Sequence, residues 1–249
     1  MNVQKKSSRF FNIFSAKPSA SIPARNPASA SCKVVILFVC MIFLLAATAP
    51  ADTMPLEQLT SKMQATYENT QDFKAQFSQE LVIQSIGKTE REEGTVYFKN
   101  PGKMLWEYTK PKAKKLVINP RTASLYVPAD RAVYVQDSAN IYKSQVIIRF
   151  LSGIGKLGDD FEIRYSEPKA VDAEGRYLLT LVPKSPDLGV EKLFLVIEPS
   201  GFRILQCSFT DSFGNITRIR FRNIRINSHL PDRLFSFKPP RGVEIHKVP

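Results

Sequence analysis

Apolar and polar residues alternate along most of the chain after residue 71, and this period of two constrains the fold more than any other feature. In residues 72–84, Phe73, Ala75 and Phe77 lie opposite Lys74 and Gln76, as in a long strand with one apolar face. Further strands are predicted over residues 89–99, 104–109, 115–119, 124–127, 131–136, 161–167, 177–183, 190–198, 202–210, 216–227 and 234–237. Turn signals rich in Pro, Gly and Asn separate these strands, which predicts an antiparallel meander.

Two segments carry apolar residues at helical spacing instead. Residues 56, 59, 63 and 67 predict a helix that begins near Pro55, after Asp52 or Thr53 as its cap, and ends by residues 69–71. Residues 138–157 interrupt the strands with a second apolar stripe, which glycines break. About eleven or twelve strands in one sheet tend to curl. We therefore expect a mainly β (α+β) fold, with a strongly curved antiparallel sheet or incomplete β-barrel whose concave apolar side is plugged by helices.

The first 51 residues have the layout of a secretory signal peptide. They contain six basic residues and no acidic one, followed by an uncharged, mostly large apolar run over residues 34–47. Ala49 and Ala51 then supply small residues at −3 and −1 of a cut after Ala51. The run is shorter than the ~20 residues of a membrane-spanning helix, so a cleaved signal is favoured over an anchor. Residues 52–249 are then a single exported domain.

A lipid-anchored mature protein is the less favoured alternative. Cys40 lies inside the apolar run, but the branched Val39 precedes it where lipoprotein signals carry a small residue. A cut at that cysteine would also leave residues 34–39 as too short an apolar region. We therefore expect a free, monomeric protein in the periplasm.

The predicted mature chain carries a net charge of +6, because the leader removes six of the 35 basic residues and none of the 23 acidic ones. Export and the lack of a basic–aromatic cluster argue against nucleic-acid binding. In residues 216–227, Ile219 and Phe221 point away from Arg218, Arg220 and Arg222, which we interpret as a solvated row. The following isoleucines fall on the arginine side, which predicts a bulge near residue 223.

The mature chain offers little reactive chemistry. Cys207 is its only cysteine, so it cannot form an internal disulfide, and its strand pattern predicts a small buried hydrophobe. His229 and His246 have no Cys or His at metal-ligand spacing, and no G-x-S-x-G elbow or phosphate-binding glycine pattern occurs. We expect no metal, no cofactor and no catalysis; an esterase that uses one of the histidines is the alternative.

Three stretches in order resemble one known family. Residues 72–79 are similar to the F-x-x-x-F-x-Q start of the periplasmic lipoprotein carriers of the LolA type. Residues 94–108 resemble the most recognisable block of that family, and residues 235–243 resemble its closing segment. The resemblance covers essentially the whole predicted mature chain.

The resemblance implies an unclosed barrel with a helical lid over a hydrophobic cavity. Such carriers take acylated lipoproteins from an inner-membrane ABC-type exporter and deliver them to an acceptor at the outer membrane. The family often has an arginine just before the proline of the central block, a residue tied to lid closure. This chain has Asn100 there, and Lys99 or Lys103 is the candidate substitute.

A set of large apolar residues on the predicted inner faces is expected to include the cavity lining, with ordinary core packing as the alternative. The set is Phe73, Phe77, Val96, Phe98, Met104, Trp106, Leu116, Ile118, Ile147, Phe150 and Leu151. Two other members of the superfamily remain alternatives to the carrier. One is a lipid- or lipoprotein-sensing envelope module, and the other is a lipid-anchored acceptor.

Overall fold

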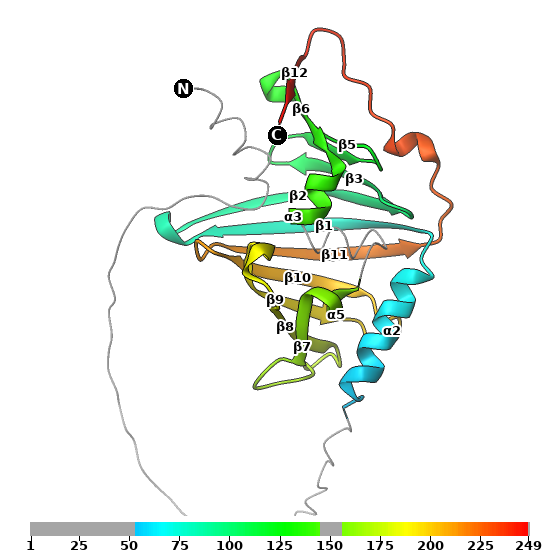
Figure 1. The fold of residues 1–249 in the computed structure, drawn as a ribbon, viewed down its shortest axis with the longest axis vertical. Helices are drawn as coiled ribbons and strands as arrows, with labels where there is room; N and C mark the ends of the chain where they lie inside the picture. Colours follow the sequence, from blue (N-terminus) through cyan, green and yellow to red (C-terminus); the bar gives the residue numbers. More distant parts are fainter. Residues whose placement is uncertain (1–52, 145–155, 249) are drawn as a thin grey trace, which may run out of the picture.

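The computed structural model describes residues 53–144 and 156–248, which form one twisted sheet with helices on one of its faces (Figure 1). The strands are β1 (Asp72–Ile83), β2 (Lys88–Lys99), β3 (Lys103–Lys110), β4 (Lys114–Ile118), β5 (Thr122–Val127), β6 (Ala132–Asp137), β7 (Phe161–Tyr165), β8 (Tyr177–Pro183), β9 (Val190–Ile197), β10 (Ile204–Asp211), β11 (Ile216–Ile226) and β12 (Glu244–Lys247). The helices are α2 (Leu56–Glu68), α3 (Ser138–Ser144) and α5 (Leu157–Asp160), with 3-10 turns η1 (Gln84–Ile86), η2 (Pro128–Asp130), η3 (Pro186–Leu188) and η4 (Asp232–Phe235).

The strand order is β12-β6-β5-β4-β3-β2-β1-β11-β10-β9-β8-β7. Among the described residues β12 and β7 are edge strands, so the sheet is not closed and the expected mainly β, unclosed architecture is confirmed. All neighbouring strands are antiparallel except β12, which pairs in parallel with β6 from Glu244 opposite Ala132.

β1 is the centre of the sheet and joins its two halves. It pairs along its whole length with β2, from Asp72 opposite Lys99 to Ile83 opposite Lys88, and on its other side with β11. In the β1–β11 ladder, Gln76 pairs with Arg222 and Lys74 pairs with Arg225. Between these two pairs β1 advances by two residues and β11 by three. This extra residue is the bulge predicted from the sequence. Asn223 has a φ of 52° there.

The face that carries the helices, called the inner face below, holds one large apolar core. Leu59, Met63 and Tyr67 of α2 are buried in it, as are Ile141 of α3 and Leu157 of α5. The predicted first helix is confirmed, but its predicted cap is wrong. Its N-cap is Pro55, without a side-chain hydrogen bond, since proline suits a position that needs no N–H donor. Most of the second apolar stripe, residues 145–155, lies outside the described residues.

The opposite face, called the outer face, has a small second core that the sequence patterns did not predict. Leu230 and Phe235 pack against Leu105 of β3 and Val117 of β4, so the C-terminal segment covers this part of the sheet. The strand predicted over residues 234–237 is wrong, because its first two residues end the 3-10 turn η4 and the next two belong to no strand. Burial of the Leu230 and Phe235 side chains against the sheet stabilises this arrangement.

Polar contacts hold this C-terminal segment in place. The Asp232 carboxylate lies 2.8 Å from Lys99 Nζ and 3.1 Å from Lys103 Nζ, and Lys99 Nζ also donates to the Leu230 carbonyl at 2.7 Å. The buried Asp72 carboxylate accepts the backbone N–H groups of Ser228 and Leu230 at 2.7 and 3.1 Å. The two lysines are therefore engaged on the outer face.

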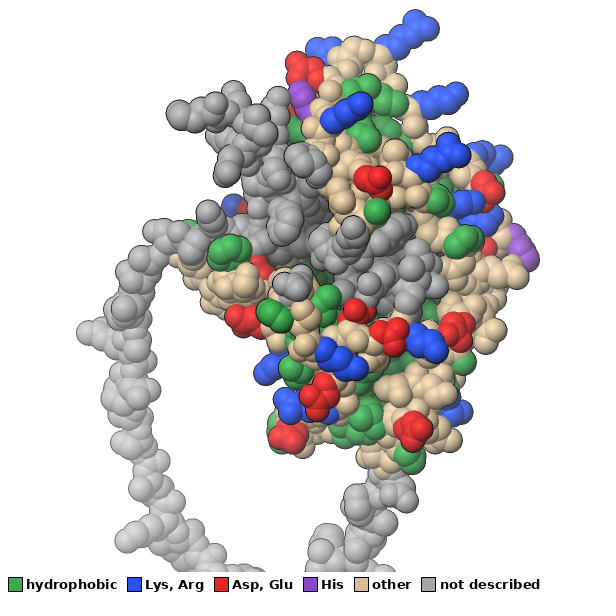
Figure 2. Space-filling model, viewed as in Figure 1, with side chains coloured by type: hydrophobic (Ala, Val, Ile, Leu, Met, Phe, Trp, Pro, Cys, Tyr) green, Lys and Arg blue, Asp and Glu red, His purple; other side chains and the backbone are tan. Residues whose placement is uncertain are grey.

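Charged side chains of both signs are interspersed over the visible surface (Figure 2). The arginine row of β11 is partly neutralised rather than free, since Glu80 Oε2 lies 3.1 Å from Arg218 and 3.6 Å from Arg220. None of the helices within residues 53–144 and 156–248 has the length and apolar run that a membrane crossing requires. The predicted signal peptide, with Cys40, lies outside the described residues.

Gly94 on β2 should be intolerant of a side chain. A Cβ there would lie 2.0 Å from the Glu107 carbonyl oxygen and 2.8 Å from the Phe77 ring. We expect Gly94→Ala to lower the free energy of unfolding by about 2 kcal/mol, as overpacking does. Urea denaturation measures this. Gly158→Ala is the control, because nothing lies within 4 Å of a Cβ at that site. Equal stability of the two variants would refute the close packing around Gly94.

Cys207 is confirmed as a buried residue, with 1% of its surface exposed, and burial raises its thiol pKa to about 12. We expect the predicted mature protein to react with a thiol-specific reagent only when it unfolds, because a buried thiol has neither access nor thiolate character. A Ser61→Cys variant, with its new thiol on the exposed side of α2, should gain one rapidly reacting group. Fast labelling of the native parent protein would contradict the burial.

Candidate functional site

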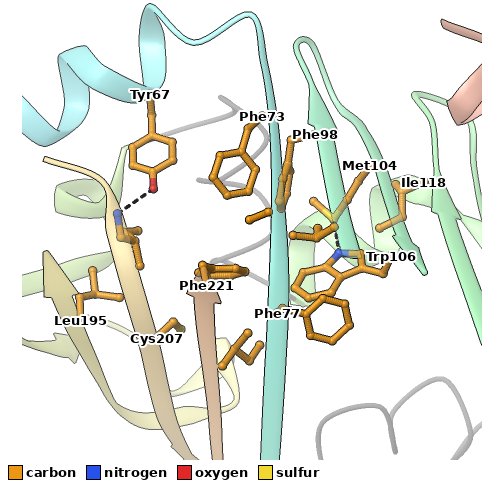
Figure 3. Close-up of a cluster of buried hydrophobic side chains, with 14 of the residues drawn as sticks. Tyr67, Phe73, Phe77, Phe98, Met104, Trp106, Ile118, Leu195, Cys207 and Phe221 are labelled. Carbon is orange, nitrogen blue, oxygen red and sulfur yellow. Dashed lines mark hydrogen bonds between the residues drawn. The ribbon is translucent and has the colours of Figure 1, made fainter. Parts of the chain in front are cut away.

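Aromatic rings from four strands meet on the inner face of the sheet (Figure 3). The Phe77 and Trp106 ring centroids are 4.8 Å apart and those of Phe73 and Phe98 are 5.3 Å apart, both edge to face. Phe221 of β11 joins this group, 6.1 Å from Phe73 and 6.4 Å from Trp106. Edge-to-face pairs of this kind stabilise an apolar cluster beyond the area that they bury.

The strand register explains why eight of the predicted cavity residues form one continuous surface. Met104 lies opposite Phe98 on one side and Ile118 on the other, and Trp106 lies between Val96 and Leu116. Each of the eight is at most 6% exposed: Phe73, Phe77, Val96, Phe98, Met104, Trp106, Leu116 and Ile118. The Trp106 indole N–H donates to the Met104 sulfur at 2.7 Å, which fixes both side chains (Figure 3).

The other three predicted residues, Ile147, Phe150 and Leu151, lie outside the described residues. The prediction also missed apolar inner-face residues in the second half of the sheet. They include Leu179, Leu181, Leu193, Leu195, Ile219 and Phe221, all buried in the same core. The alternation of apolar residues over residues 177–183, 190–198 and 216–221 could have indicated them, because every second side chain of a strand lies on the same face.

α2 covers the inner face beside β10. The buried Tyr67 hydroxyl accepts the Ile204 N–H at 3.1 Å, and burial raises the pKa of Tyr67 (Figure 3). Near the start of the helix, the Tyr165 hydroxyl donates to the Met54 carbonyl at 2.6 Å. Beyond the last turn, Asn100 Nδ2 donates to the Thr70 carbonyl at 2.6 Å. Among the described residues, α2 is thus held by its buried apolar stripe, by these hydrogen bonds and by the Thr66 hydroxyl, which donates to the Gly201 carbonyl at 3.3 Å.

Asn100 occupies the position where the resembled family often has arginine. Besides the Nδ2 bond to Thr70, its backbone N–H donates to the Gln71 carbonyl at 2.9 Å, so it ties the β2–β3 turn to the link between α2 and β1. Lys99 and Lys103 instead contact Asp232 on the outer face. Among the described residues, the asparagine is thus the side chain of this turn that reaches the end of α2.

A groove of about 470 Å³ lies between α2 and the start of α5. Met63 of α2, Leu157 of α5 and Ile163 of β7 contribute to its walls, together with polar residues of both helices. Met63 and Leu157 also belong to the inner-face core. The groove therefore lies between two helices, against the edge of the inner-face core.

Polar groups replace apolar ones at one end of the aromatic cluster. Along β3, Met104 and Trp106 are followed on the same face by Tyr108, which lies opposite Lys114 of β4. Lys114 Nζ is 2.7 Å from Glu92 Oε1, and the side chains of this ion pair are only 17% and 23% exposed. Lys114 Nζ also lies 4.2 Å above the Tyr108 ring. The inner face thus changes from apolar to ionic within one strand.

Chemically, this surface suits an amphiphile with long apolar chains and a polar end. Within residues 53–144 and 156–248 no three His, Cys, Asp or Glu side chains gather as metal ligands. His246 lies 3.2 Å from Glu244 on the edge strand β12, away from the aromatic cluster. The arrangement favours non-covalent binding on the inner face.

Comparison with known proteins agrees with this geometry. Residues 68–238 match the family model described as "Outer membrane lipoprotein carrier protein LolA". The chain is 32% identical over 177 residues to an outer-membrane lipoprotein carrier protein of Dechloromonas aromatica, covering 71% of this chain and 82% of that protein. It is 29% identical to the Methylococcus capsulatus protein of the same name, covering 85% and 95% of the two chains.

Among solved structures, an uncharacterized conserved protein from Thermus thermophilus shares the fold with a TM-score of 0.50 and 12% identity. The superposition covers 77% of this chain and 98% of that one. The family match spans most of the described sheet, including β1 to β11 and the C-terminal cover, and the carriers align over most of their own length. This chain therefore belongs to the LolA family of outer-membrane lipoprotein carrier proteins.

Proposed function

We propose that the protein is a periplasmic carrier that binds the acyl chains of lipoproteins on the inner face of its sheet. It receives them from an inner-membrane ABC-type exporter and delivers them to an acceptor at the outer membrane. The acyl chains contact the eight described residues of the predicted set, and Ile147, Phe150 and Leu151 remain proposed members of that lining. Binding is non-covalent, without catalysis or a cofactor.

The observation that carries this proposal is the continuous apolar surface that the eight described residues form on the inner face, which helices cover. Covering acyl chains is energetically necessary, because leaving them in water costs about 0.8 kcal/mol per methylene. A soluble carrier must therefore offer a large apolar surface of its own. The ladder from Ile118 through Met104 and Phe98 to Phe73 supplies such a surface across four strands.

Delivery demands that this surface also open. Among the described residues, α2 packs on the core through Leu59, Met63 and Tyr67 and is hydrogen-bonded to the sheet side by Tyr67 and Thr66, and these are the contacts that opening must break. The opening is proposed at the groove between α2 and the start of α5, whose walls include Met63 and Leu157 of the inner-face core. Cargo then passes on because the acceptor binds the acyl chains more tightly than the carrier does.

The direct test is transfer of a native lipoprotein. We expect the predicted mature protein to release a triacylated lipoprotein from inner-membrane vesicles that contain the exporter, in the presence of ATP, as a soluble one-to-one complex. Vesicles without ATP are the control. A lipoprotein that stays in the vesicles under both conditions would refute the carrier proposal.

Met104 is the residue best placed to test the proposed binding surface, because it is fully buried at the centre of the ladder. Replacing it with Glu introduces a carboxylate among apolar side chains and should weaken acyl-chain binding at least about tenfold. Met104→Leu is the control, since a volume-conserving apolar change is well tolerated. A fluorescent fatty-acyl probe measures both affinities. Unchanged binding by folded Met104→Glu protein would exclude this surface.

Asn100→Ala should loosen α2 at its C-terminal end, because it removes the side-chain bond to the Thr70 carbonyl. We expect a loss of about 1 kcal/mol in stability and faster amide exchange in the last turn of α2. Asn119→Ala is the matched control. Asn119 uses its side chain only within the β4–β5 turn, so that variant should leave exchange in α2 unchanged. Hydrogen exchange with mass spectrometry distinguishes the two outcomes.

A further inference from the structure

One buried hydroxyl on the inner face has no hydrogen-bond partner among the described residues. Tyr108 is 3% exposed, and its Oη makes no hydrogen bond with any described residue. A buried polar group without a partner costs free energy, and native structures satisfy most such groups. Ser85 Oγ is also unpaired among the described residues, but it belongs to a partly exposed turn residue. Within the part of the chain that the structure describes, Tyr108 is therefore the unpaired hydroxyl that lies in the proposed binding surface.

The packing around Tyr108 holds its ring firmly. Phe77 contacts it edge to face at 5.0 Å, and Trp106 lies nearly parallel to it at 6.3 Å. Gly94 lies between Phe77 and Tyr108 in the register, and its missing side chain lets the two rings meet across β2. The Lys114 ammonium covers the ring face at 4.2 Å. The hydroxyl is thus a fixed group.

Tyr108 lies at the boundary between the apolar ladder and the ionic edge. Residues two apart on a strand are separated by about 6.8 Å, so Met104, Trp106 and Tyr108 form a row about 14 Å long. Lys114 and Glu92 neutralise each other beside the last member of this row. An acylated lipid has the same order of parts: an apolar chain, a carbonyl linkage, and then a polar body.

We propose that the Tyr108 hydroxyl donates a hydrogen bond to the carbonyl oxygen of an acyl ester and so sets the depth at which the acyl chain sits on the inner face. This inference rests on the proposed function and specifies which part of the cargo one residue recognises. Tyr108 acts as a binding and specificity residue. A carbonyl oxygen only accepts hydrogen bonds, and a protonated tyrosine supplies the donor that it needs.

The surroundings keep that donor protonated. Burial raises the pKa of Tyr108 well above its ordinary value, and the nearby Glu92 carboxylate raises it further. A group whose pKa rises in this way stays neutral through the physiological range. The contact should therefore be independent of pH from 6 to about 9, below the ordinary tyrosine pKa of about 10.

Ester carbonyls occur both in diacylglyceryl lipopeptides and in phospholipids, so the test uses both. We would measure the affinity of the predicted mature protein for a diacyl lipopeptide with ester-linked chains and for its ether-linked analogue with chains of equal length. The same comparison is then made between an ester-linked phospholipid and its ether-linked analogue. The ether analogues retain the apolar chains but lack the carbonyl oxygens.

Wild-type protein should bind the ester form of the true ligand class about fivefold more tightly than its ether form, as one neutral hydrogen bond allows. Tyr108→Phe should bind ester and ether equally, with ether affinity unchanged. The matched control is Tyr126→Phe, which removes a hydroxyl from the outer face beside Phe237 and should preserve the preference. The ligand class that shows the ester preference, lipopeptide or phospholipid, is the source of the ester.

Stability provides a second readout. Removing an unpartnered hydroxyl should leave the thermal midpoint unchanged or raise it, so a clear decrease in Tyr108→Phe would overturn the inference by revealing a protein partner. Wild-type protein without any ester preference would also overturn it, as would a preference that persists in Tyr108→Phe. If the wild-type protein binds none of the four lipids, the proposed function itself is refuted.

Discussion

The simultaneous pairing of β1 with β2 and with β11 is the constraint on which the rest of the structure depends. β2 follows β1 directly, whereas β11 comes from the far end of the chain. Together they place Phe77 beside both Gly94 and Phe221, and thereby merge two separate meanders into one inner face. Without the β1–β11 ladder, each half would expose an unpaired edge and only part of the apolar surface.

The two faces of this sheet serve different purposes. On the outer face, the C-terminal segment buries Leu105 and Val117. Its Asp232 forms ion pairs with two lysines of the sheet, and its backbone N–H groups donate to the Asp72 carboxylate. That cover is secured by several polar contacts. On the inner face, α2 is held by a narrow apolar stripe and isolated hydrogen bonds. We propose that the inner face is the one that opens, as a carrier of acyl chains requires.

The inner face is also graded along the strand direction. Met104 and Trp106 are surrounded by apolar groups, Tyr108 offers a hydroxyl, and the Lys114–Glu92 pair ends the row. Such a gradient matches the polarity of an acylated lipid along its length. In the proposed binding mode it would also limit how deep a ligand enters, because a chain that moved past Tyr108 would meet a neutralised but poorly hydrated ion pair.

Local sequence pattern was sufficient for most of the strands, for the bulge at Asn223 and for eight inner-face residues, because side-chain parity follows directly from a period of two. The same parity indicated Cys207 as buried. Only the tertiary structure decided the parallel pairing of β12, the 3-10 turn over the outer face and the partner of Asn100. It also decided that the Tyr108 hydroxyl finds no partner within residues 53–144 and 156–248. Each of these depends on which distant segments meet, and the chain pattern of a single segment carries no information about its partner across the sheet.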